Sequence, residues 1–289
     1  MSTVVAGVVL GAVAAAVVWR AAGSVFEHPG LARTNVRGRP VPTAGGIVFP
    51  LALLPLWAFA LIDLARGWDV WPNDLAFAAT GVLGPVVVFA TLGLVDDLLA
   101  VGAERGFRGH LRALAHGRLT TGGIKLLGGG IAAAGFAVTA GSATRPLWQF
   151  AADALLVALA ANLANLLDRA PGRVTKVSVI ALVALVVSTA PGARPVLGGA
   201  ALVVGLALGL LVAELREQVM LGDTGANALG AVLGLAVVTT ADTPVRLGVL
   251  AALVALNLAS ERVSFSAVIA RVAPLRWVDE LGRLPHEPR

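Results

Sequence analysis

The chain has 289 residues, of which 57% are hydrophobic and only 13% are charged, with a formal net charge of +5. A soluble domain usually has roughly 25% charged residues, and a mean hydropathy of +0.86 means more apolar surface than such a domain can bury. The composition therefore excludes a soluble globular protein and predicts an all-α polytopic integral membrane protein, because the apolar runs are too long and continuous for a membrane β-barrel.

Nine apolar runs, separated by charged or Pro/Gly-containing breaks, are candidate transmembrane helices. They cover about residues 3–22, 44–64, 75–95, 122–140, 148–167, 174–190, 195–213, 224–240 and 244–260. No basic segment precedes the first run, so we expect a retained span rather than a cleaved signal peptide. Short Pro-containing turns separate the sixth run from the seventh and the eighth from the ninth, which predicts tight helical hairpins.

The basic residues predict the orientation of these spans. If the amino terminus lies outside, the external loops contain Arg66, Arg145, Arg194 and Arg246, and every other Lys and Arg falls in a cytoplasmic segment. This is the bias that the positive-inside rule describes. We therefore expect the amino terminus outside and the carboxyl terminus in the cytoplasm, and the positive net charge does not indicate nucleic-acid binding.

The first polar cluster is "RTNVRGRPVPTAGG" (33–46), before the second span, and the next is Asp96–Asp97, which ends the third. A carboxylate near hydrocarbon costs about 2–4 kcal/mol, and the carboxyl end of a helix is the negative end of its dipole. A cation must therefore offset the charges of Asp96 and Asp97. The pair is either a solvated or Arg-paired surface feature, or part of a site for Mg²⁺ and phosphate, because Mg²⁺ is typically held by one or two carboxylates and substrate phosphates.

The segment that follows is basic. Between the third and fourth spans and at the start of the fourth lie Arg105, Arg108, His110, Arg112, His116, Arg118 and Lys125. Anionic lipid headgroups would account for these charges, and so would a bound diphosphate or lipid phosphate.

Two further polar clusters fall at cytoplasmic ends of spans. "NLANLLD" (162–168) places Asn162, Asn165 and Asp168 on one helical face, where they either line a polar pocket or join neighbouring helices. "MLGDTGANALG" (220–230) contains Asp223, which is either a helix N-cap or a second carboxylate for a metal site.

The tail, residues 261–289, differs from the transmembrane domain, residues 1–260. Its apolar residues approximate an amphipathic stripe, and Arg271 and Arg276 interrupt any apolar stretch of spanning length. We expect a helix at the membrane interface, with a tenth span as the alternative.

The four motifs, in this order, resemble the polyprenyl-phosphate N-acetylhexosaminyl-1-phosphate transferase family, over about residues 30–235. That family includes phospho-N-acetylmuramoyl-pentapeptide transferase and UDP-GlcNAc:undecaprenyl-phosphate GlcNAc-1-phosphate transferases. The resemblance implies a Mg²⁺-dependent enzyme of the bacterial plasma membrane, with its active site at the cytoplasmic face. A polyprenyl phosphate would attack a UDP-sugar and release UMP for cell-envelope glycan synthesis, such as that of peptidoglycan.

The resemblance also implies roles for residues. Asp96 and Asp97 match the acidic pair that handles the lipid phosphate and the chemistry. The resemblance leaves open whether Asp97 acts as a base, as a nucleophile or as an orienting group. Asp223, with Asp97, matches the metal-binding position. The implied substrate-binding residues are Asn162, Asn165, Asp168, Lys125, Asn35, Arg37 and Thr43. A homodimer is compatible with the resemblance.

The chain departs from the family pattern at two motifs and in its nine expected spans, where the family usually has ten or more. Pro171 stands where a second aspartate is expected, and the late His-rich motif is absent, with His286 the one histidine of the tail. These departures leave open a catalytically altered paralogue that binds a lipid carrier or partner proteins. A transporter is less consistent with the sequence, because transporters place ionisable groups near the bilayer midplane.

Overall fold

The computed structural model describes residues 2–68, 70–71, 73–99, 120–140 and 145–285. The basic residues Arg105, Arg108, His110, Arg112, His116 and Arg118 lie outside the described residues, and so does His286. Their proposed contact with lipid headgroups or phosphate therefore stays a prediction.

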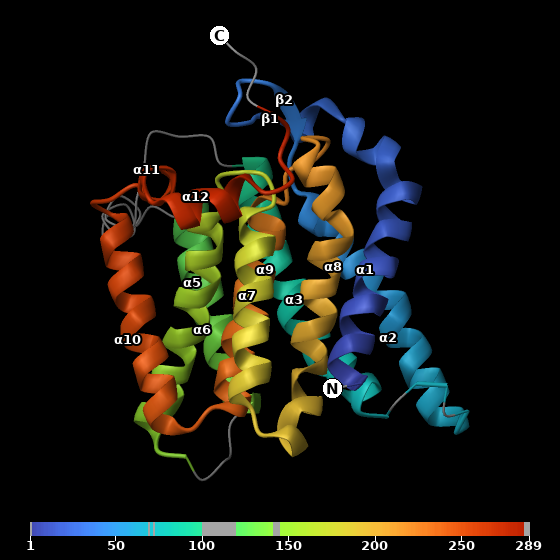
Figure 1. Cartoon of the computed structure of the whole chain (residues 1–289). Helices are drawn as coiled ribbons and strands as arrows, with labels where there is room; N and C mark the ends of the chain where they lie inside the picture. Colours follow the sequence, from blue (N-terminus) through green and yellow to red (C-terminus); the bar gives the residue numbers. More distant parts are fainter. Residues whose placement is uncertain (1, 69, 72, 100–119, 141–144, 286–289) are drawn as a thin grey trace.

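Each of the nine predicted apolar runs folds as a helix, and the nine helices run side by side in one bundle (Figure 1). They are α1 (Ser2–Ala22), α2 (Val48–Arg66), α3 (Asn73–Leu99), α5 (Thr121–Ala140), α6 (Leu147–Leu167), α7 (Arg173–Ser188), α8 (Gly198–Leu215), α9 (Gly222–Thr240) and α10 (Thr243–Ser260). In the described part of the chain, seven helices are long and apolar enough to cross a membrane; α7 and α9 are not in that group. The chain is thus an all-α polytopic membrane protein, whereas its span count and orientation stay predictions.

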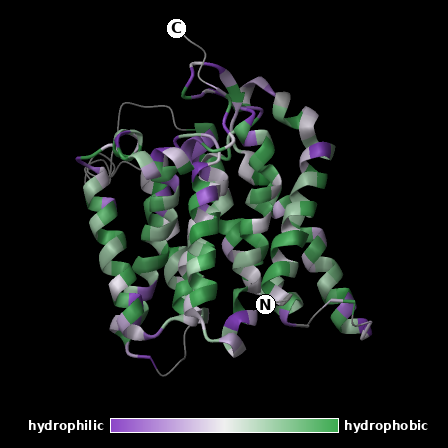
Figure 2. Cartoon of the chain, viewed as in Figure 1, coloured by the Kyte–Doolittle hydropathy of each residue, from purple (hydrophilic) through white to green (hydrophobic). Residues whose placement is uncertain are grey.

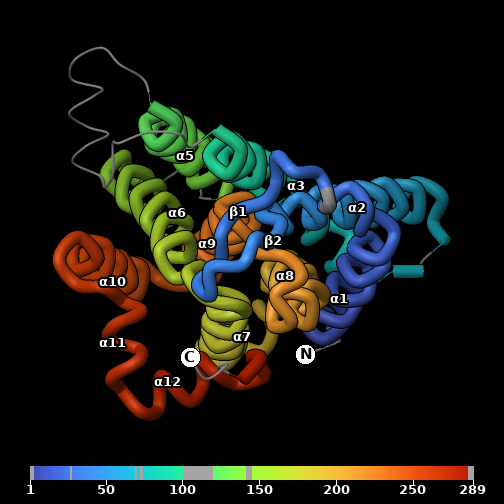
Figure 3. Tube along the Cα trace, turned by 90° about the horizontal axis from the view of Figure 1, so that it is seen from above, coloured from blue at the N-terminus to red at the C-terminus, as the bar shows by residue number. Residues whose placement is uncertain are grey.

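Helices α8 and α9 form the centre of the bundle (Figure 3). Helix α8 packs along α1, and α9 packs between α3 and α6. Small residues make these contacts close: a Cβ at Gly205 would lie 2.3 Å from the Val8 carbonyl oxygen, and one at Gly230 would lie 2.4 Å from that of Ala160. Such close backbone approach favours helix association in a lipid environment, where apolar surface alone gives little driving force.

The segment before α2 forms a β-hairpin that the sequence analysis did not predict. Strands β1 (Ala32–Thr34) and β2 (Pro40–Pro42) pair antiparallel, with Arg33 opposite Val41. The Asn35 side chain accepts hydrogen bonds from the backbone N–H groups of Arg37 and Arg39, which closes the turn. Among the described connecting segments there are four 3₁₀ helices: η1 (Gly23–Glu27), η2 (Pro29–Leu31), η3 (Gly45–Ile47) and η4 (Pro191–Leu197).

The hairpin lies at the same end of the bundle as the carboxyl ends of α3, α6 and α8 and the amino ends of α5, α7 and α9 (Figure 1). We call this the hairpin end. Figure 2 shows apolar residues along the middle of the helices and polar residues gathered near the two ends. The four motifs of the sequence analysis all lie at the hairpin end.

The tail also lies at the hairpin end. It forms two short helices, α11 (Phe265–Arg271) and α12 (Ala273–Glu280), instead of one amphipathic helix. Pro274 separates them, because proline favours the first turn of a helix and disfavours helical backbone in the preceding residue. Trp277 on α12 is 67% exposed, and Asp279 faces the bundle and is 9% exposed.

Candidate active site

Asp97, in the last turn of α3, caps the amino terminus of a different helix, α9. Its Oδ1 accepts the backbone N–H of Asp223 at 3.1 Å, and its Oδ2 accepts that of Thr224 at 3.0 Å. The Thr224 hydroxyl donates to the same Oδ2 at 2.6 Å, and the Thr43 hydroxyl donates to Oδ1 at 3.4 Å. The positive end of the α9 dipole thus stabilises a carboxylate that the negative end of α3 disfavours.

Asp168, at the carboxyl end of α6, lies beside Gly222, the first residue of α9. Burial raises the pKa of Asp168 well above its ordinary value, and repulsion from the neighbouring acids Glu214, Asp223 and Asp97 raises it further. Acids from α3 and α6 therefore converge on the first turn of α9.

Asp223 uses its own side chain elsewhere, so it is not the N-cap of α9, which was one reading of the sequence. Its Oδ2 accepts a short hydrogen bond from the Lys125 ammonium group and a second, at 3.1 Å, from the Asn165 amide. The same ammonium lies 3.9 Å from Asp96 Oδ2. Lys125, near the amino end of α5, is therefore a cation that offsets the acids of α3 and α9.

A second cationic contact supports the end of α3. One guanidinium nitrogen of Arg33, on the hairpin, donates to the Asp97 carbonyl at 2.8 Å and to the Leu98 carbonyl at 3.3 Å. These carbonyls belong to the last turn of α3, where a positive charge is favourable. Arg33 thereby fixes the hairpin to the helix that carries Asp96 and Asp97.

The backbone before α2 holds the start of α9 in place. Gly45 and Gly46 donate their N–H groups to the carbonyls of Met220 and Leu221, at 3.0 and 2.9 Å. A Cβ at Gly46 would lie 2.0 Å from the Gly225 nitrogen, and one at Gly93 of α3 would lie 2.2 Å from the Asp223 carbonyl oxygen. Only glycine permits these two backbones to approach α9 so closely.

A pocket of about 470 Å³ opens beside these groups. Its lining includes the acids Asp96, Asp97, Asp168, Glu214, Glu217 and Asp223. It also includes Asn165, the hairpin residues Thr34 and Asn35, Thr43, and the loop Arg169–Pro171. Its size suits a small organic ligand, for which sites of about 300–1,000 Å³ are typical. Carboxylates repel a phosphate, so this pocket suits a phosphorylated, hydroxyl-rich molecule that binds together with a cation.

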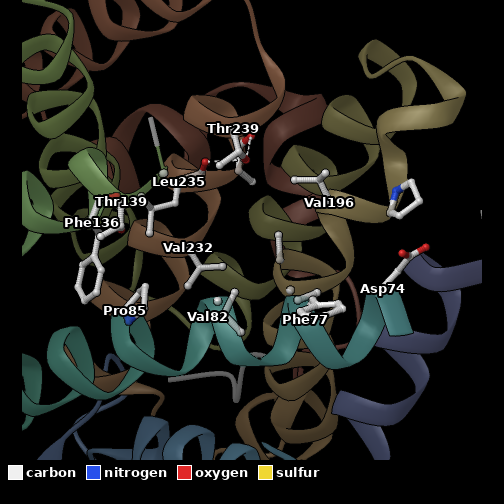
Figure 4. Close-up of a pocket in the computed structure, with 17 residues that line it drawn as sticks. Asp74, Phe77, Val82, Pro85, Phe136, Thr139, Val196, Val232, Leu235 and Thr239 are labelled. Atoms are coloured by element: carbon white, nitrogen blue, oxygen red, sulfur yellow. Dashed lines mark hydrogen bonds between the residues drawn. The ribbon is translucent and has the colours of Figure 1, made fainter. Parts of the chain in front are cut away.

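A second cavity, of about 520 Å³, lies toward the opposite end of the bundle (Figure 4). Phe77 and Val82 of α3, Phe136 of α5 and Leu235 of α9 point into it, and Asp74 is the single charged residue among its described lining residues. Its apolar lining suits hydrocarbon rather than phosphate. The polar pocket at the hairpin end is therefore the candidate active site.

Two of the residues predicted to bind substrate have other partners. Asn162 donates to the Asn257 side chain of α10 at 2.7 Å and does not line the pocket, so it joins two helices. Arg37 forms an ion pair with Glu217 at 2.7 Å. By contrast, Asn35, Thr43, Asn165 and Asp168 line the pocket as expected, and Lys125 stands beside it.

Sequence reasoning missed four side chains of this region: Arg33, Thr224, Glu214 and Glu217. Glu214 is 2% exposed and accepts the Thr175 hydroxyl at 3.1 Å. An acid at the end of the highly apolar α8 was a signal that could have identified it. Thr224 follows Asp223 directly, and only the structure shows that its hydroxyl meets Asp97.

The donor set fits a divalent cation in the manner of Mg²⁺. Asp96 and Asp223 direct carboxylate oxygens toward the same cationic group, Lys125, and Mg²⁺ needs only one or two protein carboxylates when substrate phosphates complete its shell. Asp97, predicted as a ligand with Asp223, already accepts four hydrogen bonds. Within the described residues no group of three acidic or histidine side chains is arranged to hold a metal alone.

Comparison with known proteins gives one family. The model of glycosyl transferase family 4 matches residues 79–241, which run from α3 to the beginning of the α9–α10 turn. This range contains Asp96, Asp97, Lys125, Asn165 and Asp223, the polar groups at the start of α9. A comparison with curated proteins found no match.

Proposed function

Because the chain belongs to glycosyl transferase family 4, whose members transfer a sugar 1-phosphate to a polyprenyl phosphate, we propose that this protein takes the sugar phosphate from a UDP-sugar. Undecaprenyl phosphate is the proposed acceptor, and UMP and a lipid-linked diphosphosugar are the products. We place the reaction at the cytoplasmic face of a bacterial plasma membrane, where UDP-sugars are made. Cell-envelope glycan synthesis, including that of peptidoglycan, is the process that would use this product.

One observation carries the proposal: Lys125 lies between Asp96 and Asp223, at the amino terminus of α9 and beside a polar pocket. Transfer of a phosphoryl group needs positioning and neutralisation of negative charge more than it needs a strong nucleophile. The Lys125 ammonium group supplies part of this neutralisation directly, whereas the first N–H groups of α9 already donate to Asp97. Asp96 and Asp223 would hold Mg²⁺, which supplies further charge neutralisation on the diphosphate when bound.

The other residues of the cluster hold these groups in position. Asp97 fixes the first turn of α9, and thereby Asp223, through the hydrogen bonds from Asp223 and Thr224. Asn165 orients the Asp223 carboxylate by donating to its Oδ2. Asp168, Asn35 and Thr43 line the pocket where the donor would bind.

The bond changes balance without an enzyme nucleophile. An oxygen of the acceptor phosphate forms a bond with the sugar-linked phosphorus of the donor. The bond from that phosphorus to the bridging oxygen breaks, and UMP leaves with the electron pair. Direct attack is the simpler route for this site, because the acceptor is already anionic and the Asp97 oxygens are engaged with α9.

Purified protein with undecaprenyl phosphate, Mg²⁺ and single UDP-sugars would test the proposal. The panel would include UDP-N-acetylglucosamine and UDP-N-acetylmuramoyl-pentapeptide, and both UMP and the lipid product would be measured. We expect at least one donor to release UMP in an acceptor-dependent way. If no donor does so, the catalytically altered paralogue, which Pro171 and the absent His-rich motif favour, is the better explanation.

A further inference from the structure

The tail of the chain contacts two segments that form walls of the polar pocket, although no described tail residue lines the pocket itself. One wall is the loop Asp168–Gly172, which joins α6 to α7. The other is the turn of the hairpin, around Asn35 and Arg37. Residues 279–285, which we call the brace, lie at the hairpin end (Figure 1) and contact the loop at Pro171 and the hairpin at Arg37.

The brace is bound to the first wall by a cluster of buried charges. Arg173, the first residue of α7, donates to both carboxylate oxygens of Asp279, at 2.7 and 3.0 Å. Arg283 donates to the same carboxylate, and its Nε donates to the Pro171 carbonyl at 3.1 Å. Lys176 donates to the Asp279 carbonyl at 2.8 Å. Arg283 of the tail therefore holds the loop at Pro171, and Asp279 of the tail holds Arg173, the residue that follows the loop.

The brace is bound to the second wall through Arg37. Its guanidinium group donates to the carbonyls of Leu284 and Pro285, the latter at 3.0 Å, and pairs with Glu217 at 2.7 Å. Glu217 also accepts the Asn35 amide at 2.9 Å. Asn35 and Glu217 both line the pocket. Arg37, predicted to bind substrate, therefore connects the hairpin, the pocket and the brace.

We propose that the brace is a positioning element that sets the distance between the two pocket walls, and thereby the affinity for the donor. The proposal rests on the proposed function only where it names the donor. Both walls are connecting segments, which are the parts of a fold most free to move. Charge-assisted hydrogen bonds to buried partners are the strong ones, so a few of them can restrain both walls.

The brace contacts the loop at Pro171, one of the two motif departures. Pro171 stands where the family pattern has an acid, and its carbonyl is the group that Arg283 holds. The side chains of Arg173, Asp279 and Arg283 are 7%, 10% and 14% exposed, so the cluster is shielded from solvent. The tail thus holds this loop through the backbone carbonyl of Pro171, because the proline side chain cannot form a hydrogen bond.

Spin labelling tests the positioning without any donor, and the absence of native cysteine makes it direct. Labels at Val36→Cys and Leu281→Cys, both exposed sites, report whether the tail is docked. Labels at Val36→Cys and Arg169→Cys report the width of the pocket mouth. We expect one narrow distance distribution for each pair and a clearly broader one for both pairs in R283Q. The matched control is R276Q, because within the described residues the Arg276 side chain donates to the Ala270 carbonyl of the tail and to no other group.

Kinetics then test the consequence for the donor. R283Q should raise the KM for the UDP-sugar about tenfold, equal to roughly 1.4 kcal/mol, and change kcat and the KM for the lipid acceptor less than twofold. R276Q should match the parent. A tail that is already undocked in the parent, or a released tail with unchanged mouth width and donor KM, would overturn the proposal. If the parent protein releases UMP from no donor, the proposed function is wrong. The distance between labels at Val36→Cys and Arg169→Cys still tests whether the brace positions the pocket walls.

Discussion

Asp97 of α3 and Thr224 of α9 meet through a single carboxylate oxygen, which accepts the threonine backbone N–H at 3.0 Å and its hydroxyl at 2.6 Å. This contact explains why adjacent acids end an apolar helix. Asp97 stabilises the start of α9, and the Asp96 carboxylate lies 3.9 Å from the Lys125 ammonium group. Both charges are unfavourable for α3 on its own and become favourable because α5 and α9 bring positive groups to the same place.

Replacement of Asp97 by asparagine should disable this junction. The amide nitrogen of asparagine cannot accept a hydrogen bond, so at least one α9 N–H would lose its partner. We expect UMP release to fall at least about a hundredfold, because the position of Asp223 depends on the junction, and the free energy of unfolding to fall by about 1 kcal/mol. Activity and thermal unfolding of D97N are the measurements. D74N, at the other end of α3, is the control, and equal activity of D97N and D74N would contradict the role of Asp97.

A methyl group at Gly93 should displace the first turn of α9. Its Cβ would lie 2.2 Å from the Asp223 carbonyl oxygen, whereas a Cβ at Gly81, three turns earlier in α3, meets no atom within 4 Å. We therefore expect G93A to lose at least about a hundredfold in activity and to unfold at a lower temperature. G81A should keep activity and gain about 0.5–1 kcal/mol in stability, because alanine favours a helix over glycine. Similar activity for the two variants would show that the close approach is unimportant.

The buried ion cluster at the opposite end of the bundle should affect stability alone. Asp153 accepts hydrogen bonds from Arg246 at 2.6 Å and from Arg145 at 3.0 Å, and both Asp153 and Arg246 are at most 5% exposed. D153A removes the carboxylate that pairs with the buried Arg246, which keeps only its neutral partners Gln149 and Thr243. The loss of a buried ion-pair partner costs about 3–5 kcal/mol. Thermal unfolding should show this loss, and the KM for the donor should not change.

A milder variant is the control for D153A. Asp242 accepts the backbone N–H of Val245 as the N-cap of α10, in an exposed position, so D242A should cost only about 1 kcal/mol. If D153A were no less stable than D242A, the cluster would not hold α6 against α10.

Docking of the tail should depend on pH only in the acid range. Burial acts to raise the pKa of Asp279, but hydrogen bonds from Arg173 and the charges of Arg283 and Arg173 outweigh it, so the pKa lies below its ordinary value. The folded pKa is thus lower than the unfolded one, and the contribution to docking is complete above about pH 4 and is lost as the pH falls through the folded value.

The Val36–Leu281 label pair measures this dependence. The distance distribution should be unchanged from pH 8 to pH 5 and broaden below about pH 4. D279N should be broad at every pH, because an amide carries no charge to pair with Arg173 and Arg283. Release of the tail near pH 6 or 7 would assign docking to a different group.

The helices were predictable because apolar runs of spanning length leave few alternatives in a membrane. Their ends were less so. The third run was expected to end at residue 95, but α3 continues to Leu99 and so includes both acids. The second was expected from residue 44, but α2 begins at Val48, because Ala44 has a left-handed φ of 60° and a 3₁₀ turn follows it. The hairpin was missed because each strand has only three residues, and two of the three residues of β2 are proline.

The site was predictable in part. The depth of each motif could be inferred from the span ends, and the structure places Asp96, Asp97, Asn165 and Asp223 around one pocket. Which side chains pair depends on the lateral order of the helices, which hydropathy does not encode. Asn162 was therefore assigned to the pocket, although its partner, Asn257, lies in the apolar run of α10.

Mg²⁺-dependent UMP release by the parent and by D223N tests the central claim most directly. Asp223 and Asp96 are proposed to hold the metal, so UMP release by the parent should stop when divalent cations are chelated and return when Mg²⁺ is added. D223N should release UMP at least about a hundredfold more slowly at every Mg²⁺ concentration, while the control D242N keeps the parent rate. A parent rate that survives chelation, or a D223N rate equal to that of the parent, would contradict the assignment of this cluster as the active site.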